Sequence, residues 1–564
     1  MITFRPMQVL APIAGIVSLA PWRVPRRHAL AALLLAVAPM GARAQLQLTH
    51  TEDAAPIPAG MLRFRMTTGW SRIDERFTAN GVRTLTDEIS TDSLGPRQLP
   101  RLTVVEQGLK TLANDGGTRL TLGRLNAQSD IRTVTTPIAL ELGLTRRLSV
   151  GVMVPIIQTR RSMHVTVNGD STRRANVGFI PARTRGSAAG TNAALYAALR
   201  SAADSLGQLI ANCPKSPNAP GCSSVNADVS GAAAARTQAQ AFADAVRAAL
   251  GIDSTSTLLA PRTGSALATA IETQRAATVS RVQQYLGPGA ATSSHVFTAD
   301  ADFSYIDLQG RGSAPGLLQS TLGGGLDSLQ TVNRLVIGGA TFAARVLVFD
   351  NFQYDTLPRH GLHARMAVGG EYRYETTRGD SAKQIGSVSP IIGSGVGVSS
   401  ALDVTTGRLA ATLAARYDKP LARTVDSPLL GNPESYFPVP IFGAVTMTPG
   451  AVVTLDVTPR FLLGEWFALD GLYGIERTGA ATYVLPGTAT CDGCGVTAFA
   501  PNTATRTAQR AGFGVRYSTV DSYLRGTTRT PIEVSFTHLE TIAGDPGVAK
   551  INRDQVAVRI FVGR

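Results

Sequence analysis

The sequence predicts a closed antiparallel β-barrel that crosses a membrane, and three features of its 564 residues predict it. The amino terminus has the form of an export signal, strand-length segments alternate apolar and polar side chains, and aromatic residues stand at the ends of the apolar stripes. An apolar outer band with aromatic girdles and a polar interior is typical of outer-membrane barrels. We expect an up-and-down barrel of about twelve strands, with an alanine-rich helical insertion in the second outer loop.

The first 44 residues have the three parts of a cleaved signal peptide. A region with three arginines precedes an apolar stretch at 29–39 and a small-x-small cleavage site at 42–44. An earlier apolar run at 9–20 is too short to span a bilayer, which indicates an overlong start or an extended leader, so the true start codon stays open. We expect a mature chain that begins near Gln45 and resides in the bacterial outer membrane.

The clearest pair of strands lies at residues 135–161, with the sequence TTPIALELGLTRRLSVGVMVPIIQTRR. Successive strand side chains point to opposite faces. The apolar side chains therefore share one face of each strand, and they are Ile138, Leu140, Leu142 and Leu144, then Leu148, Val150, Val152, Val154 and Ile156. A soluble sandwich shows the same alternation with its apolar face inward, so this hairpin alone does not decide between sandwich and barrel.

Ten further segments alternate in the same way, which makes twelve strands, and even strand counts are the rule for bacterial barrels. They are 60–73, 334–350, 361–377, 395–405, 408–420, 449–462, 466–479, 506–519, 531–542 and 552–562. The weakest is 334–350, because its alternation breaks at Gly338 and Gly339. Aromatic residues end several stripes: Tyr372, Tyr374, Tyr417, Phe461, Phe467, Tyr473 and Tyr517. They favour lipid outside and water inside over a soluble sandwich.

The lengths of the connections alternate along the chain. Mostly short connections are expected at 145–147, 351–360, 406–407, 463–465 and 520–530, and longer ones rich in Gly, Ser, Thr and Pro lie between them. Short periplasmic turns and long outer loops behave in this way. With both termini in the periplasm, successive connections lie alternately on the periplasmic and the outer side. This count places all four cysteines in connections on the outer side.

Residues 190–287 differ in composition from the rest, since they are rich in alanine and repeat apolar residues at helical spacing. The spaced residues are Leu195, Leu199, Leu206 and Ile210, then Phe242, Val246 and Leu250, then Leu267, Ile271, Val279 and Leu286, and Ser265 is expected to cap the third helix. The insertion divides the barrel strands into 45–189 and 288–564. It could act as a lid above the barrel, as a plug in the lumen, or as a partly disordered loop.

The four cysteines form two local pairs, Cys213 with Cys222 in CPKSPNAPGC and Cys491 with Cys494 in CDGC. Export to an oxidising compartment favours two disulfides. A four-cysteine zinc site would need the two pairs to meet in space, and a redox CxxC normally lies beside a βαβ pattern. We expect no metal and no cofactor.

The net charge of +14 falls to +9 without the leader, which holds five arginines and no acids. Basicity alone could indicate nucleic acid, but export makes that partner improbable. The expected partners are outer-membrane lipid and lipopolysaccharide, a small-molecule solute, and the barrel-assembly machinery during biogenesis. A solubilising role explains the surface charge equally well.

Two hairpins resemble a known family. The segments are LELGLTRRLSVGVMVPI and TPIEVSFTHLETIAGD, the latter followed by RDQVAVRIFVGR. They are similar to outer-membrane proteins of the meta-pathway phenol-degradation family, regarded as carriers of aromatic compounds. The resemblance implies a barrel and, from the family's role, passage of aromatic solutes. The helical insertion departs from the simpler members, and so does the carboxyl end, where Phe561 lies three residues before Arg564.

Charged residues on the polar faces of the strands are the candidates for lining a lumen, where they would select what passes. They are Arg63, Arg65, Glu141, Arg365, Glu371, Arg373, Asp456, Arg460, Arg516, Glu533 and Arg559. Arg63, Arg65, Arg365 and Arg373 are the best candidates for a cationic constriction. For any single residue the competing interpretation is an ion pair that braces the barrel.

A catalytic role has little support in the sequence. The histidines of the expected mature chain are His50, His164, His295, His360, His363 and His538. Ser535 and His538 lie three apart on one strand and therefore on opposite faces, and no P-loop, HExxH or GxSxG motif occurs. We expect a barrel that is not an enzyme and that admits small solutes, aromatic or hydrophobic ones among them, by passive or facilitated diffusion. The alternatives are a structural or adhesive barrel whose insertion binds a partner, and a barrel hydrolase.

Overall fold

A computed structural model describes most of the chain after residue 52. The described residues are 53–87, 89–99, 101–169, 175–291, 295–311, 314–320, 322–323, 331–352, 357–374, 393–425, 429–430, 438–439, 441–442, 445–484, 490–491 and 504–563. The predicted signal peptide and the predicted disulfide of Cys494 lie outside these residues.

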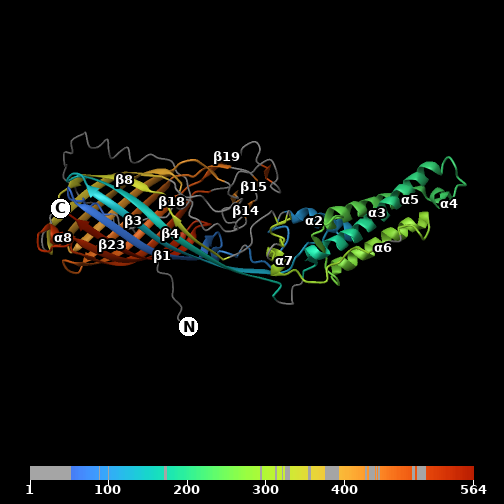
Figure 1. Cartoon of the computed structure of the whole chain (residues 1–564), viewed down its shortest axis with the longest axis horizontal. Coiled ribbons are helices and arrows are strands. Elements are labelled where there is room, and N and C mark those ends of the chain that lie inside the picture. Colours follow the sequence, from blue (N-terminus) through green and yellow to red (C-terminus); the bar gives the residue numbers. More distant parts are fainter. Residues whose placement is uncertain are drawn as a thin grey trace, which may run out of the picture. The chain divides into compact units, whose positions relative to one another are not determined.

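Within the described residues, twelve antiparallel strand positions close into a barrel, as predicted (Figure 1). They are β1 (Leu62–Thr78), β3 (Leu125–Gly143), β4 (Leu148–Val167), β7 (Val332–Ile337) with β8 (Thr341–Asp350), β9 (Arg359–Arg373), β10 (Gly395–Gly407), β11 (Leu409–Pro420), β17 (Val452–Leu462), β18 (Phe467–Thr478), β21 (Arg506–Ser518), β22 (Ile532–Gly544) and β23 (Ala549–Val562). Each pairs with the next along the chain, and β1 pairs with both β23 and β3, which closes the sheet.

The predicted strand 334–350 is divided in two at the glycines that weakened its pattern. Both β7 and β8 pair with β4, in the registers Ile156↔Ile337 and Met153↔Thr341. Between them the Gly338 N–H donates to the Pro155 carbonyl at 2.7 Å. The two pieces therefore occupy one position in the wall, and the count of twelve is unchanged.

Apart from the twelve positions of the barrel wall, the described residues contain small strands and short helices. The strands are β2 (Gly81–Thr84), β5 (Val177–Phe179), β6 (Leu259–Pro261), β12 (Arg423–Val425), β13 (Leu429–Leu430), β14 (Pro438–Val439), β15 (Ile441–Phe442), β16 (Val445–Thr448), β19 (Thr482–Val484) and β20 (Thr490–Cys491). The short helices are α7 (Tyr305–Gln309) and α8 (Val520–Leu524). Of the small strands, β2 extends the edge of β1 and the others form two- and three-stranded sheets of their own.

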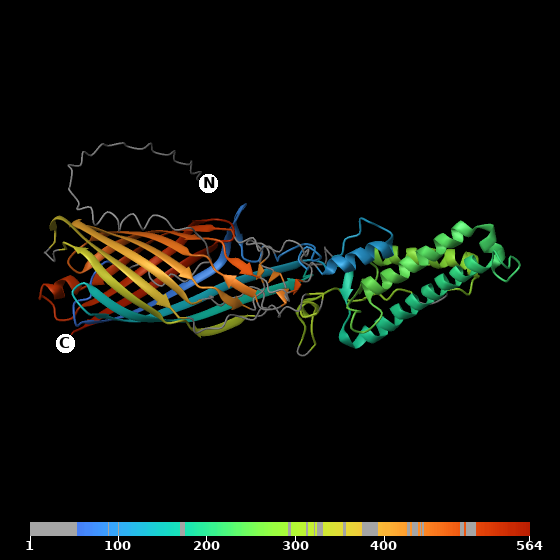
Figure 2. The same cartoon turned by 90° about the horizontal axis from the view of Figure 1, so that it is seen from above.

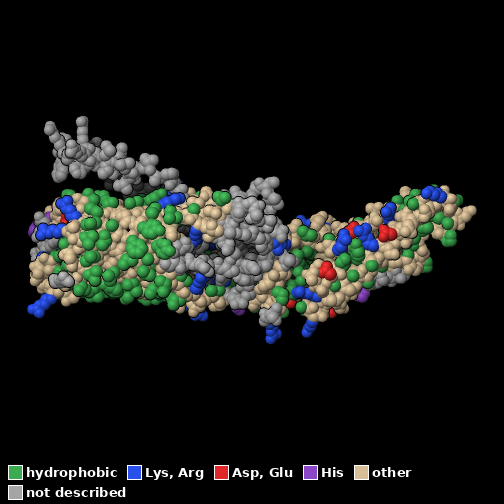
Figure 3. All heavy atoms as spheres, turned by 45° about the horizontal axis from the view of Figure 1, so that its top comes forward, with side chains coloured by type: hydrophobic (Ala, Val, Ile, Leu, Met, Phe, Trp, Pro, Cys, Tyr) green, Lys and Arg blue, Asp and Glu red, His purple; other side chains and the backbone are tan. Residues whose placement is uncertain are grey.

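The apolar stripes face outward. In the hairpin of β3 and β4, Leu140 pairs with Val152 and Leu142 with Val150, and Leu140 is 44% exposed although it is a large apolar residue. Exposed aromatic residues on the same wall include Trp70, Phe467 and Tyr473. The barrel accordingly shows a band of hydrophobic side chains on its outside (Figure 3). A single closed sheet with such a band fits lipid outside and contradicts stacked soluble sheets.

The connections follow the predicted parity. The short turns join β3 to β4, β8 to β9, β10 to β11, β17 to β18 and β21 to β22, and β1 begins and β23 ends at the same end of the barrel. We call this the turn end. Cys213, Cys222 and Cys491 lie in connections at the opposite end, as parity requires.

The insertion is helical, and its helices lie alongside one another (Figure 2). They are α3 (Ala182–Asn212), α4 (Cys222–Ala227), α5 (Val229–Leu250) and α6 (Ala266–Leu286), so helix begins at Ala182 rather than at residue 190. Leu195, Leu199, Val246 and Ile271 are fully buried, as their spacing predicts. The Ser265 hydroxyl accepts the Ala268 N–H at 3.1 Å, which confirms the predicted cap.

The predicted helical insertion in the second outer loop is joined by a helix from the first outer loop. Helix α2 (Leu102–Ala113) lies in the first outer loop, and its apolar residues join the hydrophobic core of α3, α5 and α6. A Cβ placed on Gly108 would lie 2.6 Å from the Ala249 Cβ, so α2 packs closely on α5. None of the helices in the described residues is long and apolar enough to cross a membrane.

The beginning of α5 is tied to the end of α6. The Asp228 carboxylate accepts the Gly231 N–H at 2.8 Å and the Tyr285 hydroxyl at 2.9 Å. The Gly231 N–H, followed by the hydroxyls of Tyr285 and Ser230, lowers the pKa of Asp228 from its ordinary value. Because that pKa is lowered, the cap contributes stability at neutral pH and is lost only when the pH falls through the lowered value.

Cys213 and Cys222 form a disulfide, as predicted, with their Cα atoms 5.3 Å apart. Both cysteines are buried in a small core with Leu206, Val225 and other residues between α3 and α6. Replacing both by serine is expected to destabilise this core by roughly 2–3 kcal/mol, the chain-entropy value for so short a loop. Limited proteolysis of the native and double-serine chains measures the effect. Equal cleavage rates in the insertion would contradict it.

Candidate functional site in the barrel lumen

The chain before β1 runs inside the barrel, and we call residues 53–58 the lumen strap. Ala54 is fully buried and packs against Leu347 of β8, Ala367 of β9 and Ala401 of β10. These strands lie across the barrel from β1, which the strap enters at its other end. The strap therefore crosses the lumen at the turn end.

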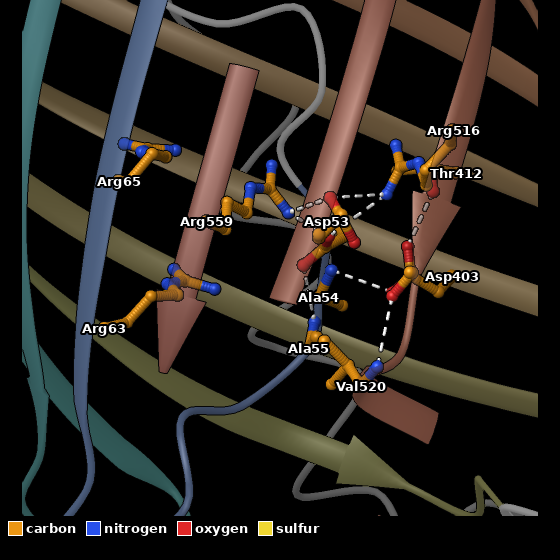
Figure 4. A network of polar contacts seen from close by, with 12 residues as sticks. Asp53, Ala54, Ala55, Arg63, Arg65, Asp403, Thr412, Arg516, Val520 and Arg559 are labelled. Atoms are coloured by element: carbon orange, nitrogen blue, oxygen red, sulfur yellow. Dashed lines mark hydrogen bonds and ion pairs between the residues drawn. The ribbon is translucent and has the colours of Figure 1, made fainter. Parts of the chain in front are cut away.

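A carboxylate on the strap meets two arginines of the wall (Figure 4). Asp53 Oδ2 accepts a hydrogen bond from Arg559 Nη1 of β23 at 2.6 Å, and Arg516 Nη1 of β21 lies 3.9 Å from the same oxygen. The next residue is held from the opposite wall, since the Ala54 N–H donates to Asp403 Oδ2 of β10 at 2.9 Å. Charge and backbone contacts thus pin one end of the strap on both sides.

The two arginines belong to a larger buried network. Arg516 and Arg559 both contact Glu533 Oε1, at 3.1 Å and 3.2 Å, and Arg516 also reaches Asp470 at 3.3 Å. Arg460 donates to the other oxygen of Asp470 at 2.6 Å. Three guanidinium groups therefore face two wall carboxylates, and the strap supplies the third carboxylate.

Asp403 joins the strap to a further pair of wall residues. It accepts hydrogen bonds from Arg365 Nε at 2.7 Å and from the Thr412 hydroxyl at 2.8 Å, besides the Ala54 N–H. Its side chain is 8% exposed. A buried carboxylate with three donors is well satisfied and fixes the height of the strap in the lumen.

Most of the other predicted lumen residues also meet charges of the opposite sign. Arg63 and Arg65 of β1 share Glu141 of β3, where the Arg65 distance is 3.7 Å. The remaining pairs are Arg373 with Asp418 at 3.1 Å and Glu371 with Arg416, and Asp456 lies against Gly474. The four arginines proposed for a cationic constriction thus all have a carboxylate partner, as in the bracing interpretation.

Several residues of the network were not predicted. Asp403, Asp418 and Asp470 lie on the predicted strands and bond with inward-facing arginines, so strict strand alternation could have identified them. Asp53 lies before the first strand, in a short stretch without periodicity. Nothing in the sequence pattern indicates that this carboxylate enters the lumen.

A cavity of about 120 Å³ opens beside the strap at the turn end. Its lining includes strap residues and Arg359, Arg365, Arg516 and Arg559, together with the aromatic residues Phe352, Trp466, Tyr523 and Phe561. The guanidinium groups of Arg359 and Arg365 lie over the Phe352 ring, 5.1 Å and 4.2 Å from its centroid. The cavity is therefore lined by both cationic and aromatic side chains.

The serine and histidine that a barrel hydrolase would need are separated by the wall. Ser535 is buried on the lumen side of β22, whereas His538 Nδ1 contacts Asp554 Oδ1 at 2.8 Å on the outer face. They cannot form a direct pair, as predicted. His363 contacts the carbonyl oxygens of Asn351 and His360 near the turn end, which suits a residue of the rim.

A scan against family models found no match, and a search of curated proteins found none either. Solved structures with a similar fold include an outer-membrane channel from Pseudomonas putida F1, at 8% identity and a TM-score of 0.36, covering 91% of this chain and 99% of that one. The translocator domain of the autotransporter NalP from Neisseria meningitidis has 8% identity and a TM-score of 0.25, with 89% and 88% covered. The Ralstonia pickettii toluene transporter TbuX has 8% identity and a TM-score of 0.25, with 93% and 96% covered.

Proposed function

We propose that this barrel resides in the bacterial outer membrane and admits small solutes, aromatic or hydrophobic ones among them, by diffusion through its lumen. The observation that carries the proposal is the lumen strap. It is joined to the wall covalently only through β1, whereas its other described contacts are hydrogen bonds, ion pairs and packing. A segment held in this way can leave the lumen without any change in the twelve-stranded wall.

The chemistry of the turn-end cavity supports aromatic solutes. Cavities of about 150 Å³ lined by apolar side chains accept benzene in other proteins, and this cavity of about 120 Å³ is of similar size. Four aromatic residues line it, namely Phe352, Trp466, Tyr523 and Phe561, and arginine faces can stack on a further ring. A small aromatic solute therefore finds both packing and cation–π contacts there.

A structural or adhesive surface barrel is the second candidate, and the insertion favours it. One hydrophobic core lies within the insertion and includes the Cys213–Cys222 disulfide, and a larger core joins the helices to residues of β3 and β4. A folded body of this kind can present a surface to a partner whether or not solutes pass through the barrel.

Liposome swelling tests the proposal against this alternative. Purified native chain and a variant lacking residues 53–58 are reconstituted, and swelling is followed in isosmotic solutions of solutes of increasing size. Uptake that depends on solute size and rises in the variant supports a channel closed by the strap. No permeation in either form contradicts transport and favours the structural barrel.

A matched deletion locates the barrier. Removing residues 190–287 from the native chain shortens the insertion and leaves the strap in place. If the strap closes the lumen, this variant swells at the native rate. If swelling rises only when the insertion is deleted, the helices form the barrier, as in the lid or plug interpretation.

A further inference from the structure

We propose that Arg559 and Arg516 form a carboxylate-binding site in the permanent wall of the barrel, and that Asp53 is its built-in occupant. A small aromatic carboxylate, with benzoate as the simplest member, takes the place of Asp53 when the strap withdraws. The inference rests on the proposed function, because it requires that the strap can leave the lumen.

The charge balance of the wall requires an anion at this point. Asp53, Asp470 and Glu533 oppose Arg460, Arg516 and Arg559 in the described network, so the departure of Asp53 removes one negative charge that these buried arginines face. The neighbouring wall is also cationic, because Arg63 and Arg65 both contact the carboxylate of Glu141. A buried guanidinium without a counter-charge is unfavourable, so the open barrel attracts an anion.

The geometry selects a carboxylate among anions. Arg559 is 4% exposed and Arg516 is 6% exposed, and both direct an Nη1 atom at the oxygen that Asp53 provides. Guanidinium groups bind planar carboxylates with charge-assisted hydrogen bonds. Because the present occupant is a carboxylate, a solute carboxylate reproduces its contacts without any rearrangement of the wall.

The surroundings of the site favour a solute that has an aromatic ring and one negative charge. The turn-end cavity begins at Asp53, Arg516 and Arg559 and continues to Phe352 and Phe561. A ring attached to the bound carboxylate therefore enters an aromatic surface. Asp403 and Glu533 also line this cavity, and their negative charges oppose a second carboxylate on the solute.

Binding of benzoate to the full chain in detergent micelles tests the site, with the fluorescence of Trp466 as the signal. Trp466 lines the cavity, and Trp70→Phe in every variant removes the other tryptophan of the expected mature chain. Asp53→Asn removes the internal competitor. In the native chain, benzoate binds only the fraction of molecules in which Asp53 has left the site. Benzoate should therefore bind Asp53→Asn at least about tenfold more tightly than it binds the native chain. Benzamide, which is neutral and of the same shape, should gain nothing.

Two variants make the test specific. Asp554→Asn removes a carboxylate from the outer wall and should bind benzoate as the native chain does. The double variant Asp53→Asn with Arg559→Met keeps the lumen network balanced, with two arginines against Asp470 and Glu533, so it should fold and lose the tighter benzoate binding. A heat-dependent gel shift verifies folding in each case.

Equal benzoate affinity in the native and Asp53→Asn chains would overturn the inference. An equal gain for benzamide, unchanged binding in the double variant, or no benzoate signal in any variant would overturn it as well. Swelling measured on the same preparations separates the two proposals. If solute uptake rises in Asp53→Asn but benzoate does not bind more tightly, the result supports the channel and contradicts the carboxylate site.

Discussion

Replacing Asp53 by alanine is expected to raise the open probability of single channels by about two orders of magnitude. Asp53 holds the strap through Arg559 at 2.6 Å and Arg516 at 3.9 Å. Breaking a buried pair by removing one partner costs about 3 kcal/mol, and each 1.4 kcal/mol is about tenfold in an equilibrium. The loss falls on the closed state, because only that state has the contact. Current recordings in planar bilayers measure the open fraction directly.

The control for this change is Asp554→Ala, which removes a carboxylate from the outer face, where it contacts His538. It should leave the open probability at the native value. Conductance that stays at the native level in Asp53→Ala would mean that the ion pair does not hold the strap. An equal rise in both variants would point to a general loosening of the barrel instead.

Replacing Arg516 by methionine is expected to have the largest effect on stability. Its guanidinium contacts Glu533 at 3.1 Å and Asp470 at 3.3 Å and lies 3.9 Å from Asp53, all in the buried lumen. Removing it leaves the three carboxylates Asp53, Asp470 and Glu533 facing Arg460 and Arg559, and an uncompensated buried charge costs about 3–5 kcal/mol. Urea unfolding of the barrel in lipid vesicles measures the loss as a lower midpoint at an unchanged slope.

A second change should restore part of this stability. Glu533→Gln in the Arg516→Met background restores a balance of two arginines, Arg460 and Arg559, against two carboxylates, so the double variant should be more stable than the single one. Arg72→Met is the matched surface control, since Arg72 pairs with Asp74 and Asp130 at 57% exposure and such pairs contribute about 1 kcal/mol or less. Equal losses for Arg516→Met and Arg72→Met would show that the lumen network does not stabilise the barrel.

The strands could be predicted because lipid and water impose opposite demands on successive residues. Where a strand extends beyond the part that has lipid on one side and water on the other, its predicted bounds were wrong. Strand β3 begins at Leu125 rather than near residue 135, and β4 continues to Val167. In these extensions Leu125, Ala127, Met163 and Val165 turn their apolar side chains to the inner face, where they join the helical core. The apolar side chains thus change from the outer to the inner face, and in the sequence this change looks like a break in the alternation.

Helix α2 was missed although its residues carry the signal. Leu102, Val105, Leu109 and Leu112 recur at helical spacing and are all buried. The stretch is short and lies between two strands, where a loop was expected. Its helix is stabilised by packing on α5, which belongs to another loop, and a contact between distant segments does not appear in a local pattern.

For the candidate site, too, the local sequence pattern predicts some features but not the contacts between distant residues. Strand alternation gives the face of each charged residue, and so Arg516, Glu533 and Arg559 could be assigned to the lumen. It does not give their partners, because Asp53 is separated from Arg559 by nearly the whole chain. The strap itself has no period that could be read, and its position depends on carboxylate and backbone contacts that exist only in the closed barrel.

A reversible lock on the strap tests the central claim most directly. Ala54 and Ala401 belong to the same buried cluster, so we place a cysteine at each of these two positions to form a disulfide between the strap and β10. We predict that single-channel current disappears when the pair is oxidised and returns when it is reduced, while the native chain responds to neither treatment. Solute passage that continues through the oxidised chain would contradict the claim that the strap closes the lumen.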